Sequence, residues 1–317
     1  MKSEFAKLAA TVLLTAVAIG CGSGGSAMSY PSGAATMSAT GETAALTAAG
    51  ADYTIALDTQ LQIGDFIATP VLGEWFGFWV WTDKTNFGLD VSSKFYRNPV
   101  QGTGWTAFDD FDIREEGYTA NVSYYSLNDS SDDISGWMVG GGYMYPLGSV
   151  YLKGDIKYGV LDSDINIFAP SLRCDYYITD VLSVGLSWDY EHYKEDSWTF
   201  SQNLFRLNVG YKIVLANPVL LKFAYGKLEE NGSDWSVRNV VVGADWMLQD
   251  KWLVSMAVVR WIDDENWANW YQAFKPSVGY RLNDNATVNL GGSFFWTSDD
   301  DDRYRTNGVQ LGYSQTF

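Results

Sequence analysis

Charged side chains are the residues of this chain whose types and spacing could do chemistry, and a single histidine stands among them. His192 lies close in sequence to Asp189, Glu191, Glu195 and Asp196. An imidazole beside carboxylates can act as a general acid or base. Nucleophilic catalysis would also need a serine or cysteine held against that base. The residues around His192 contain no complete set of this kind, so the sequence predicts that the protein is not an enzyme.

The densest acidic cluster is a run of four carboxylates, Asp299, Asp300, Asp301 and Asp302. The run could hold Ca²⁺ or Mg²⁺, because hard cations prefer oxygen ligands. Its spacing matches no defined calcium loop, so a solvated acidic surface is the alternative interpretation. We therefore expect either no cofactor or a divalent cation at this cluster. The formal net charge of -17 argues against nucleic acid as a partner, since phosphate binding needs clustered Lys and Arg.

The composition indicates which elements position these side chains. Aromatic residues make up 16% of the chain, yet the mean hydropathy is only -0.12. Strands with one apolar and one polar face produce this combination, because each apolar residue alternates with a polar neighbour. After the N-terminal segment, no apolar run approaches the roughly 20 residues that a membrane-spanning helix needs.

Alternation is clear from residue 117 onward. In residues 182–191, for example, Leu, Val, Trp and Tyr alternate with Ser, Gly, Asp and Glu. Tight turns are predicted at 146–149, 179–180, 216–218, 249–251 and 283–285, and longer, acidic connections at 128–135, 162–166, 194–199, 229–235, 263–270 and 298–305. Tight and long connections alternate along the chain, which favours antiparallel strands that pair with their neighbours in sequence.

The last predicted strand carries a family resemblance. Val309, Leu311, Tyr313 and Phe317 share one face of this strand, which ends the chain. It resembles the C-terminal signal strand of bacterial outer-membrane β-barrels, in which a terminal Phe and apolar residues at alternate positions are recognised by the assembly machinery. The resemblance implies an all-β fold, a transmembrane antiparallel up-and-down β-barrel with short periplasmic turns and long extracellular loops. The C-terminus would then be periplasmic.

The predicted number of strands is 12 to 14. Residues 117–317 form the barrel core and contain twelve alternating segments. A hairpin at 75–96, turning at Thr82 to Thr85, would add two more. Residues 98–116 would then be an unusually long periplasmic connection. The stretch from Tyr53 to Ile63 also alternates, and it could be a further strand, a plug or a periplasmic piece.

The N-terminal part reads as export and linker sequence. Residues 1–18 have the basic start, short apolar core and small-x-small site of a signal peptide. Cleavage before Cys21, as in a lipoprotein, is the alternative. Residues 19–50 have the Gly, Ser, Ala and Thr composition of a flexible linker, and 51–116 form an N-terminal segment before the barrel core.

Strand parity places many charged side chains on the inner face of the expected barrel. The predicted lumen-lining residues are Lys153, Asp155, Lys157, Arg173, Asp175, Asp189, Glu191, Arg206, Lys212, Lys222, Asp245, Lys275 and Arg281. Basic residues outnumber acidic ones in this set. Such a wall could fill the interior with ion pairs, or it could leave a wet channel that favours anionic or polyhydroxylated solutes. His192 and Cys174 take the opposite parity and are expected to face lipid.

Aromatic residues gather near the ends of the predicted strands, as in the interfacial girdles of membrane barrels. The outer set is Trp188, Tyr190, Trp261 and Trp296, and the periplasmic set is Tyr145, Tyr176, Tyr211, Trp246, Trp252, Tyr280, Tyr313 and Phe317. These two sets would mark the two membrane surfaces.

The function that agrees best with these features is a porin-like channel in the bacterial outer membrane, for passive diffusion of small hydrophilic solutes. One alternative is a non-conducting structural or surface-recognition barrel, whose acidic loops bind cations or lipopolysaccharide. A translocator of the autotransporter type agrees less well, because the N-terminal region is too short for a substantial passenger. No full motif of a barrel phospholipase or an omptin-like protease is present. The expected partners are outer-membrane lipids, lipopolysaccharide, the barrel assembly machinery and small solutes.

Overall fold

The structure is a computed structural model, and it describes residues 54–68, 79–97, 106–128, 133–161, 165–195, 199–232, 236–263, 270–283, 286–298 and 305–316. The predicted signal peptide, the alternative cleavage site at Cys21 and the predicted linker therefore lie outside the described residues, as does Phe317. One helix, α4, lies within the described ranges, and none there is long and apolar enough to cross a membrane. The strands are β1 (Thr54–Ala68), β2 (Trp79–Tyr96), β3 (Gly117–Asn128), β4 (Asp133–Leu147), β5 (Val150–Leu161), β6 (Ile165–Thr179), β7 (Leu182–Lys194), β8 (Thr199–Ile213), β9 (Val219–Glu230), β10 (Ser236–Leu248), β11 (Trp252–Asp263), β12 (Trp270–Asn283), β13 (Ala286–Ser298) and β14 (Arg305–Thr316), and the helix is α4 (Thr106–Asp112).

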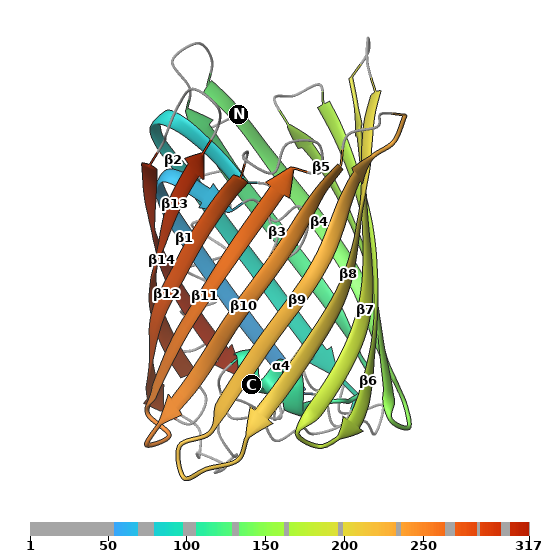
Figure 1. Cartoon of the computed structure of the whole chain (residues 1–317), viewed down its shortest axis with the longest axis vertical. Helices are drawn as coiled ribbons and strands as arrows, with labels where there is room; N and C mark the ends of the chain where they lie inside the picture. Colours follow the sequence, from blue (N-terminus) through green and yellow to red (C-terminus); the bar gives the residue numbers. More distant parts are fainter. Residues whose placement is uncertain are drawn as a thin grey trace, which may run out of the picture.

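The fourteen strands form one closed antiparallel barrel (Figure 1). Each strand pairs with its neighbours in sequence, and β1 pairs with β14 from Ala56↔Thr316 to Gly64↔Gly308. Closure gives every strand two partners, so no backbone edge is left unpaired. The predicted fold class is confirmed, with 14 strands. We call the barrel end where β14 finishes the C-terminal end, and the other the opposite end.

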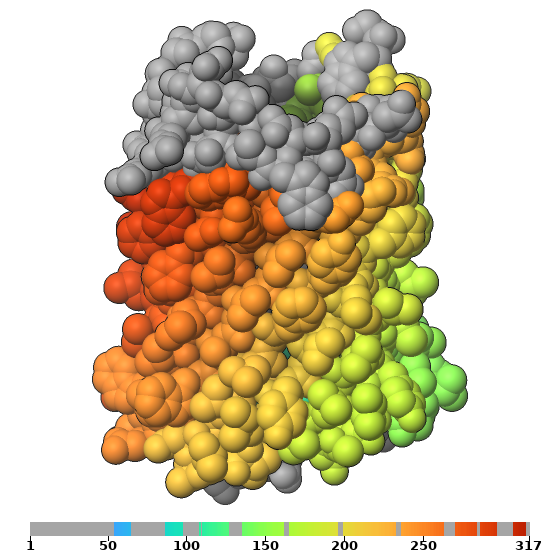
Figure 2. Space-filling model, viewed as in Figure 1, coloured from blue at the N-terminus to red at the C-terminus, as the bar shows by residue number. Residues whose placement is uncertain are grey.

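The strands separate an apolar outer face from a more polar inner face. In β7, for instance, Ser183, Ser187 and Asp189 are buried inside, whereas the side chain of Leu186 is 65% exposed outside. On β13, Leu290 is 60% exposed in the same way. Figure 2 shows side chains of this outer face covering the wall over the strands of the second half of the chain. Exposed apolar surface of this extent is unusual for a protein surrounded by water.

The first two strands differ from the predicted hairpin. β2 is a single strand from Trp79 to Tyr96, and it pairs with β1. β1 includes most of the stretch from Tyr53 to Ile63, which the sequence left open as a further strand, a plug or a periplasmic piece. The prediction of a hairpin at residues 75–96 was therefore wrong. Residues 82–85 fall between Trp81 and Asn86, which pair with Phe66 and Gly64, so they make an irregularity in the pairing and not a reversal of the chain.

Aromatic side chains lie on the outer face at the C-terminal end. Six of the predicted periplasmic set are exposed there: Tyr145, Tyr176, Tyr211, Trp246, Trp252 and Tyr280. Trp261 corrects the prediction for the other set, because it packs against a buried cluster on the inner wall that includes Val259 and Phe295. It shares the inner face with Val259, two residues earlier on β11, and so does not belong to an outer girdle.

The connection between β2 and β3 does not stay at the rim. Its described part, residues 106–116, comprises α4 and a short extended piece, and we call it the inner segment. The other connections at the C-terminal end are tight, such as residues 148–149 and 180–181. At the opposite end the strands run further than predicted, and only residues 129–132 separate β3 from β4.

Candidate functional site

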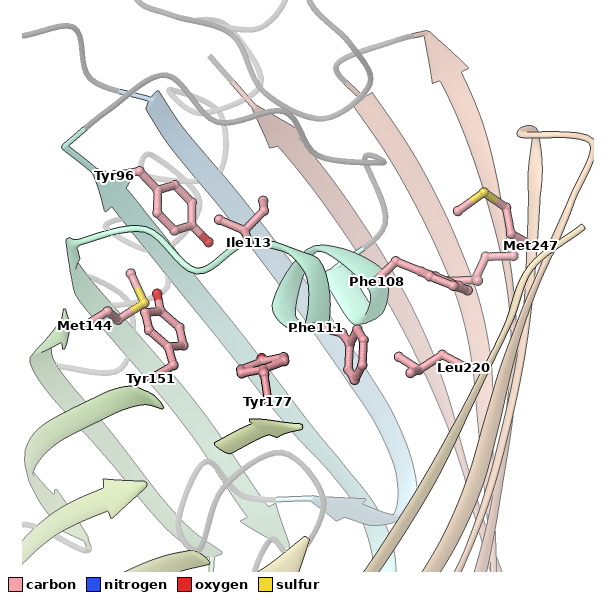
Figure 3. Close-up of a cluster of buried hydrophobic side chains, with 10 residues drawn as sticks. Tyr96, Phe108, Phe111, Ile113, Met144, Tyr151, Tyr177, Leu220 and Met247 are labelled. Atoms are coloured by element: carbon pink, nitrogen blue, oxygen red, sulfur yellow. The ribbon is translucent and has the colours of Figure 1, made fainter. Parts of the chain in front are cut away.

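The inner segment occupies the interior of the barrel at its C-terminal end. Phe108, Phe111 and Ile113 are buried in a cluster with inward side chains of seven strands (Figure 3). Those side chains are Tyr96, Met144, Tyr151, Tyr177, Leu220, Met247 and Leu253. Because their strands are distributed around the barrel, the segment must lie across the interior and not against one side of it.

A short amphipathic pattern explains why this segment docks as a helix. Phe108 and Phe111 are three residues apart, so they lie on the same face of one helical turn. Phe108 has no exposed side-chain surface, and the ring of Phe111 meets the ring of Tyr177 edge-on, with centroids 5.7 Å apart. Figure 3 shows Phe111 pointing toward Tyr177 and Leu220. A helix of seven residues is not stable alone, so its conformation depends on this packing.

Ion pairs fix the helix to two distant strands. Lys94 of β2 pairs with Asp110, and Lys212 of β8 pairs with Asp112. Between β2 and β8 lie five strands on one side of the barrel and seven on the other, so the two lysines come from opposite walls. The helix therefore connects the two walls through carboxylates that are two positions apart.

The rest of the inner segment is held by polar contacts near the rim. Tyr151 donates a hydrogen bond from its hydroxyl to the Glu115 carbonyl at 2.8 Å, and Arg114 pairs with Asp180 at 3.1 Å. Glu116 accepts hydrogen bonds from Tyr143 and Arg97, and these lower the pKa of its carboxyl. The chain thus returns to the wall at a defined point before β3 begins.

Burial and neighbouring cations act in opposite directions on the carboxyl of Asp110. Burial opposes its ionisation, but the positive charges of Lys94, Lys153 and Arg173 outweigh that effect and lower its pKa to about 2. Asp110 is therefore a carboxylate at any physiological pH. Three cations from β2, β5 and β6 act on one anionic group.

A glycine on β8 makes room for the helix. A Cβ atom placed at Gly210 would lie 2.9 Å from Cε2 of Phe111 and 2.9 Å from Oγ of Ser183. Both distances are shorter than ordinary van der Waals contact. The absence of a side chain at this position is thus part of how the barrel accepts α4.

Further along the barrel, the predicted lumen residues form ion pairs on the inner face. Arg206 pairs with Asp189, and Lys222 pairs with Asp245. Both pairs join neighbouring strands, β7 with β8 and β9 with β10. They are ladder contacts of the kind that tie adjacent strands together inside small barrels.

Four more of the predicted lumen residues lie on β5 and β6. Arg173 pairs with Asp175 on its own strand at 2.7 Å, and Asp155 accepts a hydrogen bond from Thr119 of β3 at 2.9 Å. Lys153 lies over the ring of Tyr151, with its Nζ 5.1 Å from the ring centroid.

The remaining predicted residues are distributed along the inner wall. Glu191 accepts hydrogen bonds from Gln202 at 2.6 Å and from Tyr193 at 3.0 Å. Lys157 lies opposite Gly140, where an added Cβ atom would approach the lysine Cγ to 2.8 Å. Lys275 is paired with Ala257 in register, and Arg281 with Thr287, both on the inner face.

The structure adds inner-face charges that the sequence did not single out. Asp90 accepts a hydrogen bond from Ser123 at 2.5 Å, and Asp58 pairs in register with Ser92 and Ser314. The inner segment contributes Asp110 and Asp112, and β2 contributes the cation Lys94, which pairs with Asp110. Within the described part of the chain, these carboxylates offset the basic excess expected from the predicted set.

The residues considered for catalysis point to different faces. His192 stacks on Tyr190 on the outer face, with the ring centroids 6.5 Å apart, while Glu191 points inward. Cys174 is exposed on the outer face and forms no disulfide. The acidic run from Asp299 to Asp302 lies outside the described residues, and the described ranges contain no group of three or more His, Cys, Asp or Glu that could hold a metal ion.

Comparison with known proteins gives remote structural likenesses only. No family model matches this chain, and no curated protein matches it. The chain is similar to the outer membrane protein Omp33 of Acinetobacter baumannii, with 10% identity, a TM-score of 0.48, and coverage of 84% of this chain and 98% of that one. It is also similar to the outer membrane channel DcaP of Acinetobacter baumannii, with 14% identity, a TM-score of 0.44, and coverage of 85% and 98%. The KdgM porin in complex with disordered oligogalacturonate gives 11% identity, a TM-score of 0.40, and coverage of 83% and 99%.

Proposed function

We propose that the protein is a porin-like channel of the bacterial outer membrane, through which small hydrophilic solutes diffuse. The single observation that carries the proposal is the contrast between the two faces of one closed wall. The outer face exposes apolar side chains such as Leu186 and Leu290, and the inner face carries ion pairs such as Arg206 with Asp189. Hydrocarbon can surround the first face, and water the second.

The size of the barrel supports a passage through it. Barrels of about 8 strands are filled by side chains, and those of 16 to 18 strands leave an aqueous channel. A barrel of fourteen strands lies between these sizes. The inner segment then narrows the passage at the C-terminal end, where Phe108 and Phe111 are buried.

Orientation follows from the same proposal. Tight turns such as residues 148–149 lie at the C-terminal end, and an aromatic belt surrounds that end on the outside. In outer-membrane barrels the tight turns are periplasmic. The C-terminus and the inner segment would accordingly be periplasmic, and the acidic connections would face lipopolysaccharide.

Planar-bilayer recording of the purified, refolded protein tests the channel. Stepwise current in potassium chloride is the expected result, with a heat-denatured sample as control. If the refolded intact protein inserts into the bilayer and carries no current, the channel proposal is wrong.

A second candidate function is a non-conducting barrel, and the inner segment is the observation that favours it. Side chains of seven strands surround Phe108, Phe111 and Ile113 at one end. A barrel closed in this way would carry no current until the segment is removed. Comparing the intact chain with a variant lacking the segment separates the two functions: current only in the variant supports the closed barrel.

We also propose that the final strand is the assembly signal. Val309 and Leu311 are exposed on the outer face of β14, and Tyr313 has the same parity. Replacing Phe317 with Ala should lower the amount of barrel assembled in the outer membrane of a Gram-negative host, measured by heat-modifiable migration on gels. Equal assembly of the variant and the intact chain would contradict this role.

A further inference from the structure

We propose that Lys94, Lys153, Arg173 and Lys212 form a binding site for small solutes that carry two anionic groups, and that Asp110 and Asp112 of the inner segment occupy this site when no solute is bound. This inference rests on the proposed channel function, because the solute must reach the interior of the barrel. It assigns a substrate class to the narrow end of the passage.

The first step is the arrangement of cations around the helix. Lys94 binds Asp110 directly, and Lys212 binds Asp112. Lys153 and Arg173 are paired in register on β5 and β6, and both act electrostatically on Asp110. Lys94 and Lys212 thus contact two carboxylates that belong to a connection and not to the wall. Lys153 and Arg173 add positive charge around Asp110, although Arg173 is itself paired with Asp175.

The second step is the chemistry that those cations recognise. Ammonium and guanidinium groups bind carboxylate and phosphate oxygens by charge-assisted hydrogen bonds. These cations bind the carboxylate of an aspartate side chain and the carboxylate of a solute through the same hydrogen bonds. Asp110 and Asp112 therefore show which ligand groups fit between these strands.

The third step is the number of charges. Asp110 reaches β2 and Asp112 reaches β8, although only one residue separates them in the helix. A solute with one negative charge can replace one of the two ion pairs. A dicarboxylate or a doubly charged phosphate compound can replace both, so that it competes better with the tethered helix.

The test uses succinate as the dianionic probe, with acetate at equal ionic strength as the control. Two readouts are needed, bilayer current and the rate at which an impermeant thiol reagent labels Met144→Cys. Met144 is buried in the same cluster as Phe108, Phe111 and Ile113, so its labelling reports displacement of the inner segment without depending on current. Background labelling is measured on the chain that retains Met144.

We expect succinate to increase both current and labelling, and acetate to do so less. The variant Asp110→Asn/Asp112→Asn should show faster labelling without any solute, by about threefold for the loss of two partly exposed ion pairs. Succinate should no longer accelerate its labelling. The matched control is Asp250→Asn in the exposed turn after β10, which should behave as the intact chain.

Each result separates the two proposals. Equal effects of succinate and acetate, or a double variant that behaves like Asp250→Asn, would overturn the anion site while steady current still supports a channel. Labelling that responds to succinate in a barrel that never conducts would support the anion site and overturn the channel. Neither outcome requires the double variant to lose its fold, because asparagine keeps the shape of aspartate.

Discussion

Gly210 shows how one residue controls the seating of α4. An added methyl group would meet Phe111 and Ser183 at 2.9 Å, so Gly210→Ala should weaken docking of the inner segment by about 1 to 3 kcal/mol. Higher current in bilayers is the expected measurement. Gly154→Ala is the matched control, because its nearest neighbour, Leu172, is 3.8 Å away on the outer face. Equal currents from the two variants would show that Phe111 moves aside without cost.

The pKa of Asp110 predicts how the inner segment at the C-terminal end of the barrel responds to acid. Its pKa is lowered to about 2 in the docked segment, against an ordinary value of about 4 for an exposed aspartate. The docked state therefore binds fewer protons than the released state, and docking loses stability as the pH falls from about 4 toward 2. Current should be constant between pH 7 and pH 5 and should increase below about pH 4. In Asp110→Asn, this acid response should be reduced.

Lys222 and Asp245 illustrate the cost of a charge inside the wall. The Asp245 side chain is only 4% exposed, so Lys222→Met should leave a buried carboxylate without its ion-pair partner and destabilise the barrel by about 3 to 5 kcal/mol. The double variant Lys222→Met/Asp245→Leu should recover most of that loss. Urea unfolding in lipid vesicles measures both. A single variant as stable as the intact chain would show that water reaches Asp245.

At the scale of elements, the inner segment is separable from the wall. The Arg97 amide donates to the Glu116 carbonyl at 2.8 Å, so the ends of the connection already stand side by side. Replacing residues 98–115 with Asn-Gly should close a tight hairpin between β2 and β3. The shortened barrel should fold, keep its heat-modifiable migration, and conduct more current than the intact chain. A folded variant with unchanged conductance would place the narrowest point elsewhere.

The sequence predicted the strands better than it predicted the interior. Alternation from residue 117 onward identified β3 to β14, because a wall with one apolar face imposes a period of two on every strand. For the inner segment, the sequence indicates only a connection of unusual length. Seven helical residues give little periodic signal, and the pair of Phe108 and Phe111 is meaningful only when the barrel around it is known.

The first strands were harder to predict for another reason. Residues 82–85 have the composition of a turn, yet pairing with β1 on both sides keeps the chain extended through them. Long-range pairing overrode a local preference. Similarly, parity identified inner residues such as Arg206, but it could not show that Asp110 and Asp112 enter the lumen from a connection.

For the whole molecule, the distribution of charge determines ion selectivity. Acidic residues of the inner segment, with Asp58 and Asp90 on the wall, offset the basic residues of β5 to β12 in the described structure. The intact channel should therefore discriminate weakly between potassium and chloride in reversal-potential measurements. The variant lacking residues 98–115 loses Asp110 and Asp112, and it should shift toward chloride. A shift toward potassium would contradict this distribution.

Closure of the barrel by its first and last strands has a consequence for biogenesis. β1 finds its second partner only when residues 305–316 have been made and delivered, because β14 supplies the register from Gly308 to Thr316. Until then the chain carries two open strand edges, which can pair with other unfinished chains. A product truncated before β14 would retain nearly every charged residue of the inner wall, yet it would aggregate or be degraded.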